Sequence, residues 1–363
     1  MDDTFHVGRK LLFHRHGVDD SIGTYATDYL LSAISFIMAG IMTYLIWRHK
    51  NNDDKRVKSS CGYEYASISQ YWAPCKWPRP VMTSVTLSTY ATLGFQSCYS
   101  LMTVLGGLPH QYLHQVEPYT SWEDSWTWLI VWRCGAVMVV PTICAFFTLI
   151  EQICQQESFL PLPNWARKVY YGVKTLLCMT AVVWNFVRLT DDTNPYDVTT
   201  LYIVFMGCFV IQSVWMTLIV CRSAIVGCKK RLIKSRKVSG DRGTQAQNDA
   251  ACTEAKDCVF RWDLCLQCLC PLLILGGGTF SYILTPMCSQ AEDPHGLHGC
   301  PLPNNFNHNA VMHMIHVMAV MSLTLGEVLA IKRRERLYKA EINNNINLEK
   351  ALDDSGTSGA LIV

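Results

Sequence analysis

Residues 304–331, NNFNHNAVMHMIHVMAVMSLTLGEVLAI, place several polar and ionisable side chains in the most apolar part of the chain. The run is long enough to cross a bilayer as a helix, because about 20 apolar residues at about 1.5 Å each match the hydrocarbon thickness. On such a helix Asn309, His313 and His316 share one face. His308 stands at the mouth of the helix. Polar groups at membrane depth usually face the protein interior, so we expect this face to mark a site.

The rest of the chain has the composition of a membrane protein. Of its 363 residues 50% are hydrophobic and only 17% are charged, and the apolar residues are concentrated in seven long runs. These runs span residues 26–47, 81–107, 126–150, 166–189, 198–221, 264–286 and 309–331. The pattern predicts an all-α membrane protein with seven transmembrane helices, in an endomembrane or the plasma membrane. Its main partner is then the lipid bilayer, and the formal charge of +2 gives no reason to expect binding to nucleic acid.

Lysine and arginine are concentrated in three of the segments outside these runs. Residues 48–79 hold seven, residues 222–262 hold ten, and residues 332–363 hold six, whereas the segments after the second and sixth runs hold none. By the positive-inside rule, the N-terminal segment 1–25 lies outside the cell or in a lumen, and the C-terminus lies in the cytosol. We interpret residues 222–262 as a basic cytosolic loop and residues 332–363 as a disordered cytosolic tail.

Candidate site residues stand at the expected outer ends of four helices. Asp28 lies about one turn inside the first helix, and His110 ends the second. Asp124 stands where the third helix begins, and His308 and His313 open the seventh. Neutral imidazoles are common zinc ligands, and a carboxylate can orient a ligand or activate a water. Together these residues have the composition of a zinc site.

Simpler interpretations of the same residues stay open. The carboxylate of Asp28 can simply stabilise its helix by interacting with the positive, N-terminal end of the helix dipole. Pro109 can break the second helix and leave His110 and His114 as solvated loop residues. The histidines would then line a wet vestibule without binding a metal.

The same residues resemble a family of seven-helix membrane hydrolases, which includes the alkaline ceramidases, lipid-remodelling proteins and adiponectin-receptor-like proteins. That family carries a histidine late in helix two, an acid early in helix three and an H-x-x-x-H pair at the start of helix seven, and its ceramidase branch has an acid that opens helix one. Asp28, His110 and Asp124 match in place, and residues 309–313 lie where the histidine pair would be. The chain is also similar to an uncharacterised multi-pass membrane family with a TDYLL start and an NHN…H helix seven.

The resemblance implies a zinc-dependent hydrolase of lipid amides or esters, and therefore a role in lipid metabolism. It implies that His110, His308 and His313 are the metal ligands. Asp124 or Asp28 would hold the attacking water.

This chain departs from the family pattern at two positions. The family has a serine four residues before the helix-two histidine, where this chain has Gly106, and the missing hydroxyl weakens oxyanion stabilisation. The first histidine of the final pair is replaced by Asn309, with His308 one residue away. The third metal ligand can therefore be either His308 or His316.

A non-enzymatic seven-helix receptor or membrane scaffold is the alternative function, because an outside N-terminus and a basic loop also suit a receptor. No D-R-Y sequence ends the third run and no N-P-x-x-Y occurs in the seventh, which argues against a rhodopsin-type receptor. The intramembrane charges Arg133, Lys174 and Glu327 do not line up as a relay, which argues against a transporter.

Overall fold

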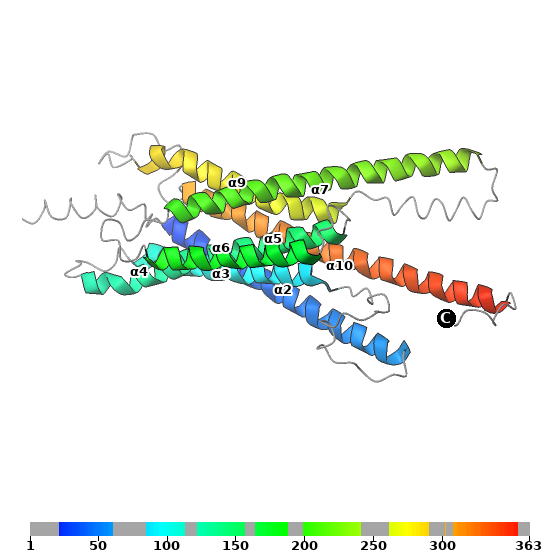
Figure 1. The fold of residues 1–363 in the computed structure, drawn as a ribbon. Coiled ribbons are helices and arrows are strands. Elements are labelled where there is room, and N and C mark those ends of the chain that lie inside the picture. Colours follow the sequence, from blue (N-terminus) through cyan, green and yellow to red (C-terminus); the bar gives the residue numbers. More distant parts are fainter. Residues whose placement is uncertain are drawn as a thin grey trace, which may run out of the picture.

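The computed structural model describes residues 22–60, 85–112, 122–156, 164–187, 199–240, 261–289, 302 and 308–354. All regular structure within these ranges is helical. The helices are α2 (Ile22–Ser60), α3 (Leu87–Tyr112), α4 (Trp122–Val137), α5 (Val139–Gln156), α6 (Asn164–Val187), α7 (Thr199–Gly240), α9 (Trp262–Ser289) and α10 (His308–Asp354). They run roughly along one common direction and form an elongated bundle (Figure 1).

Five helical stretches in the described part are long and apolar enough to cross a membrane, and the chain is therefore a multi-pass integral membrane protein. They are Ile22–Asn51, Ile130–Gln156, Met206–Val226, Trp262–Leu284 and His308–Leu337. The second and fourth apolar runs of the sequence form α3 and α6, which are helices but do not belong to these five.

The polar character of α3 follows from its position between other helices. It packs against α2, α4, α5 and α10. Its buried side chains include Ser88, Thr89, Thr92, Gln96 and Ser100. Polar side chains on membrane helices are stabilised by hydrogen bonds to neighbouring helices. A helix that is enclosed in this way needs less apolar surface than one that faces lipid.

The third expected helix, residues 126–150, is bent. α4 ends at Val137 and α5 begins at Val139, and the amide N–H of Met138 between them is shared by two carbonyls at 3.3 and 3.1 Å. Pro141 explains the bend, because proline has no N–H and its ring clashes with the carbonyl four residues earlier. The two helices together form one bent span.

Three helices extend beyond the bundle at the same end, namely α2, α7 and α10 (Figure 1). α7 continues to Gly240 and α10 to Asp354, so the first part of the basic loop and most of the C-terminal tail are helical. The tail therefore differs from the disordered segment that we expected. Its Lys, Arg, Glu and Leu residues lose little entropy in a helix, and Glu335 and Lys339 form a pair four residues apart at 3.3 Å.

The bundle core contains a chain of aromatic contacts between α3, α5 and α7. Phe95 stacks on Tyr99 with 5.3 Å between ring centroids, and it also contacts Phe146 at 5.5 Å. Phe146 in turn contacts Phe209 at 6.0 Å. Such pairs contribute about 0.5–1.5 kcal/mol each beyond their burial. These contacts link α3 to α5 and α5 to α7.

α9 and α10 approach each other closely at two glycines. A Cβ atom added at Gly277 of α9 would lie 3.1 Å from the ring of His316. A Cβ atom at Gly326 of α10 would lie 2.8 Å from Cγ of Gln267 and 2.9 Å from the carbonyl oxygen of Asp263. Small residues allow this kind of close helix packing in membranes.

Candidate metal centre

Asp28 and His313 lie side by side although they are at opposite ends of the chain. α2 and α10 pack against each other and both begin at the same end of the bundle (Figure 1). The Asp28 Oδ1 atom is 3.3 Å from Nε2 of His313. Both residues are buried, at 4% and 8% exposure. A carboxylate and an imidazole are therefore held close together and away from solvent.

Thr27 lies against the ring of His313. Its Oγ1 atom lies 2.6 Å from the carbonyl oxygen of Gly23 and 2.9 Å from that of Thr24, and the same oxygen lies 3.1 Å from Nδ1 of His313. The hydroxyl has one proton, which it donates either to a carbonyl or to Nδ1. In the first arrangement His313 is protonated on Nδ1, and in the second its proton is on Nε2 and is donated to Asp28.

In the first arrangement, a neutral His313 presents the lone pair of Nε2 to the carboxylate of Asp28. Two buried electron pairs facing each other are unfavourable unless a cation lies between them. That cation is either a second ring proton or a metal ion. Nε2 of a neutral imidazole in the first arrangement is a suitable zinc ligand.

Asn309, also at the start of α10, contacts α9. Asn309 accepts a hydrogen bond from Oγ of Ser281 on α9 at 2.9 Å. His308 is buried at the first residue of α10, five residues before His313 and thus about 140° around the helix from it.

His316 is enclosed in the middle of the bundle. Its Nε2–H donates to the carbonyl oxygen of Ile274 at 3.3 Å, and its Nδ1 accepts from the hydroxyl of Tyr99 at 2.7 Å. Both ring nitrogens are occupied by protein groups, so His316 is poorly suited to be a metal ligand. The face shared by the α10 residues in sequence is thus divided among α2, α3 and α9.

The side chains of His110 and Asp124 lie outside the described part, although their backbones belong to α3 and α4. The backbone of α3 touches α2 next to the site, because a Cβ atom at Gly107 would lie 2.9 Å from Cβ of Asp28. His110 follows Gly107 by three residues. Among the side chains that are described, no group of three His, Cys, Asp or Glu residues is placed to hold a metal ion.

Sequence reasoning missed a second polar cluster at the other end of the bundle, centred on Glu327 of α10. This carboxylate is fully buried and accepts hydrogen bonds from Ser88 at 3.1 Å, Thr89 at 2.8 Å and Gln267 at 2.8 Å. Arg334 forms an ion pair with it at 2.7 Å. The available signal was the seven-residue spacing, which places acid and base on one helix face.

The other two intramembrane charges lie in surroundings of their own. Lys174 of α6 donates to Oγ1 of Thr148 at 2.5 Å and lies 4.8 Å from the ring centroid of Tyr171. Arg133 is only 1% exposed, so its guanidinium does not reach the surface. Lys174 thereby attaches α6 to α5.

Comparisons with protein-family models, with curated proteins and with solved structures found no match for this chain. Its function must therefore be inferred from its own residues and their geometry.

Proposed function

We propose that this chain is a seven-span membrane hydrolase that acts on lipid amides or esters with zinc at the outer end of its bundle. The observation that carries the proposal is the buried Asp28–His313 pair, which holds an imidazole nitrogen 3.3 Å from a carboxylate oxygen away from solvent. The resemblance to the ceramidase-like hydrolases supplies the reaction class, and the membrane location supplies lipids as substrates.

The proposed topology counts α3 and α6 as the two further spans. Both are 24 residues or longer, which is sufficient for a membrane helix. The extended ends of α2, α7 and α10 carry many Lys and Arg residues and lie at one end of the bundle (Figure 1). The positive-inside rule places this end in the cytosol. The Asp28–His313 pair then lies at the outer or lumenal face.

In this proposal His313 holds the metal through Nε2, and His110 and His308 complete the set of ligands. Such a set would hold zinc, which would supply polarisation of a carbonyl group and activation of a water. Asp28 or Asp124 holds the attacking water and accepts its proton. Thr27 keeps the His313 ring in the orientation that directs Nε2 at the site, as residues behind metal ligands commonly do.

Metal content of the detergent-purified protein tests the proposal. We expect about one zinc per chain by mass spectrometry and its loss in a His110→Ala/His313→Ala double variant. His49→Ala is the control, because His49 is also buried but lies near the other end of the α2 span. Absence of zinc from the unaltered protein, or its retention in the double variant, would refute the metal centre and favour a receptor or scaffold.

Activity is tested separately with long-chain fatty amides and esters in mixed micelles. Fatty-acid release should depend on zinc and should disappear in His313→Ala and in Asp28→Asn. Zinc-loaded protein that cleaves neither class of lipid would contradict the hydrolase assignment while leaving the metal centre in place.

Thr27 offers a finer prediction. Thr27→Val removes the acceptor of the His313 Nδ1–H bond, and we expect zinc affinity to fall by roughly 10–100-fold. Thr27→Ser keeps the hydroxyl and should bind zinc nearly as tightly as the original protein. Competition with a chromogenic chelator measures both affinities. Equal affinity in the Val and Ser variants would mean that Thr27 does not orient the ring.

A further inference from the structure

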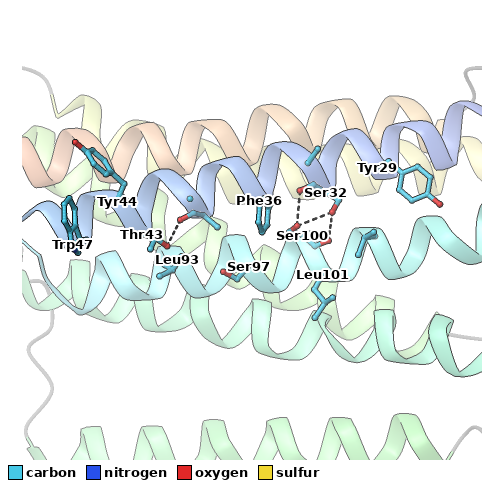
Figure 2. A pocket seen from close by; sticks show the side chains of 14 residues that line it. Tyr29, Ser32, Phe36, Thr43, Tyr44, Trp47, Leu93, Ser97, Ser100 and Leu101 are labelled. Atoms are coloured by element: carbon cyan, nitrogen blue, oxygen red, sulfur yellow. Dashed lines mark hydrogen bonds between the residues drawn. The ribbon is translucent and has the colours of Figure 1, made fainter.

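A groove of about 1030 Å³ runs along the outside of the bundle between α2 and α3 (Figure 2). Tyr29 lies at one end of it, and Tyr44 and Trp47 lie at the other. Its lining contains no charged residue and is mostly apolar. The volume is at the upper end of the range for small-molecule sites.

Small side chains create this space. Ala33, Gly40 and Ser97 line the groove, and a Cβ atom at Gly40 would meet nothing within 4 Å. Phe36 is 73% exposed in the middle of the groove (Figure 2). The two helices therefore separate at their surface while they remain in contact below it.

The polar atoms in the groove are largely satisfied within the protein. The Oγ atoms of Ser32 and Ser100 donate to each other's backbone carbonyls at 2.9 and 3.0 Å (Figure 2). Thr43 donates to the carbonyl of Ala39 at 2.9 Å. What remains for an occupant is apolar surface, so the groove does not suit a polar head group or a peptide.

The position of the groove in the membrane identifies the occupant. It follows α2 from Tyr29 to Trp47, about 27 Å at 1.5 Å per residue, inside the Ile22–Asn51 span. Hydrocarbon at this depth is about 30 Å thick and its chains run along the helices. The groove is thus a lipid-facing channel with the polarity and direction of an acyl chain.

The outer end of the groove is one residue along α2 from the candidate metal centre, although Asp28 and His313 do not line it. Tyr29 follows Asp28 directly, and its hydroxyl donates to Oε1 of Gln111 on α3 at 2.6 Å. We propose that the groove binds one acyl chain of a membrane lipid, with the polar end of that lipid at the Asp28–His313 pair. The placement of the polar end rests on the proposed function, whereas binding of the chain does not.

Photolabelling tests the proposal. The full-length protein is placed in phosphatidylcholine nanodiscs that contain a phosphatidylcholine with a diazirine in its acyl chain, and labelled peptides are mapped by mass spectrometry. Peptides that line the groove should be labelled several-fold more than other lipid-facing peptides. Gly40→Phe fills the groove and should remove this excess. Gly276→Phe is the matched control, because Gly276 is also an exposed helical glycine with nothing within 4 Å, and it should leave the excess unchanged.

The other outcomes each overturn the proposal. Even labelling of all lipid-facing helices would mean that the groove has no preferred occupant. Protection of the groove together with a dimer in light scattering would assign it to a second copy of the chain. Measuring the zinc content of the same protein distinguishes failure of this proposal from failure of the proposed function. Bound zinc together with even labelling would reject only lipid binding in the groove. Preferential labelling of the groove without bound zinc would reject only the metal centre.

Discussion

Arg334→Ala is expected to destabilise the folded protein by about 3–5 kcal/mol, because it leaves a buried carboxylate without its counter-charge. Glu327 is fully buried, and Arg334 pairs with it at 2.7 Å. The hydrogen bonds from Ser88, Thr89 and Gln267 remain, but they do not neutralise the charge. The free energy of unfolding in detergent, from denaturant titration followed by circular dichroism, measures the effect.

Two further variants separate loss of the ion pair from loss of a side chain. Lys339→Ala, on the same helix, removes only an exposed pair with Glu335, and it should change the free energy of unfolding by no more than about 0.5 kcal/mol. Glu327→Gln/Arg334→Ala removes both charges and should recover part of the stability. If Arg334→Ala lowers the free energy of unfolding no more than Lys339→Ala does, the polar cluster around Glu327 contributes little to stability.

Gly326→Ala should be the most damaging single-methyl change at the α9–α10 interface. The added Cβ would lie 2.8 Å from Cγ of Gln267 and 2.9 Å from the carbonyl oxygen of Asp263. A backbone atom cannot move aside as a flexible side chain can, so the two helices must separate. Overpacking of this kind costs about 1–3 kcal/mol or more. Thermal unfolding of the purified protein should therefore begin at a clearly lower temperature.

The control for this prediction is Gly276→Ala on α9. A Cβ atom at Gly276 meets nothing within 4 Å. The change should therefore raise the free energy of unfolding by about 0.5–1 kcal/mol, because alanine lowers the chain entropy of the unfolded state. The two substitutions are chemically identical, and their opposite signs would isolate the effect of close packing. Similar melting temperatures for both variants would mean that α9 and α10 are not held at the distance described.

The two clusters on α10 suggest how this helix organises the bundle. His313 contacts α2 near the end of the bundle where α10 begins, His316 contacts α3 and α9 in the middle, and Glu327 contacts α3 and α9 towards the opposite end. Each polar residue therefore contacts particular neighbouring helices at a particular position along the bundle. Membrane helices gain little from apolar contact with each other rather than with lipid, so such polar contacts and close packing determine how they associate.

The sequence predicted the helices from their apolar runs better than it predicted the contacts of the candidate site. Within the residues that the structure describes, each apolar run is almost entirely helical, and the third is divided between α4 and α5, because apolar length is a property of a local segment. The bend between α4 and α5 has a local signal in Pro141, which the run-based prediction did not use. Asp28 and His313 could be selected as candidates from their depth alone. Their mutual distance, and the role of Thr27 between them, could not be obtained from spacing.

Hydrophobicity and charge act locally along the chain, so the amino-acid order is enough to show a multi-pass helical membrane protein with its basic residues concentrated in a few segments. Which polar residues meet depends on the packing of the helices. Thr27 and His313 are 286 residues apart, and Ser88 and Glu327 are 239 apart. Their contacts depend on which helices pack together and at what rotation, and this is set by glycines and buried hydrogen bonds between helices rather than by any local pattern.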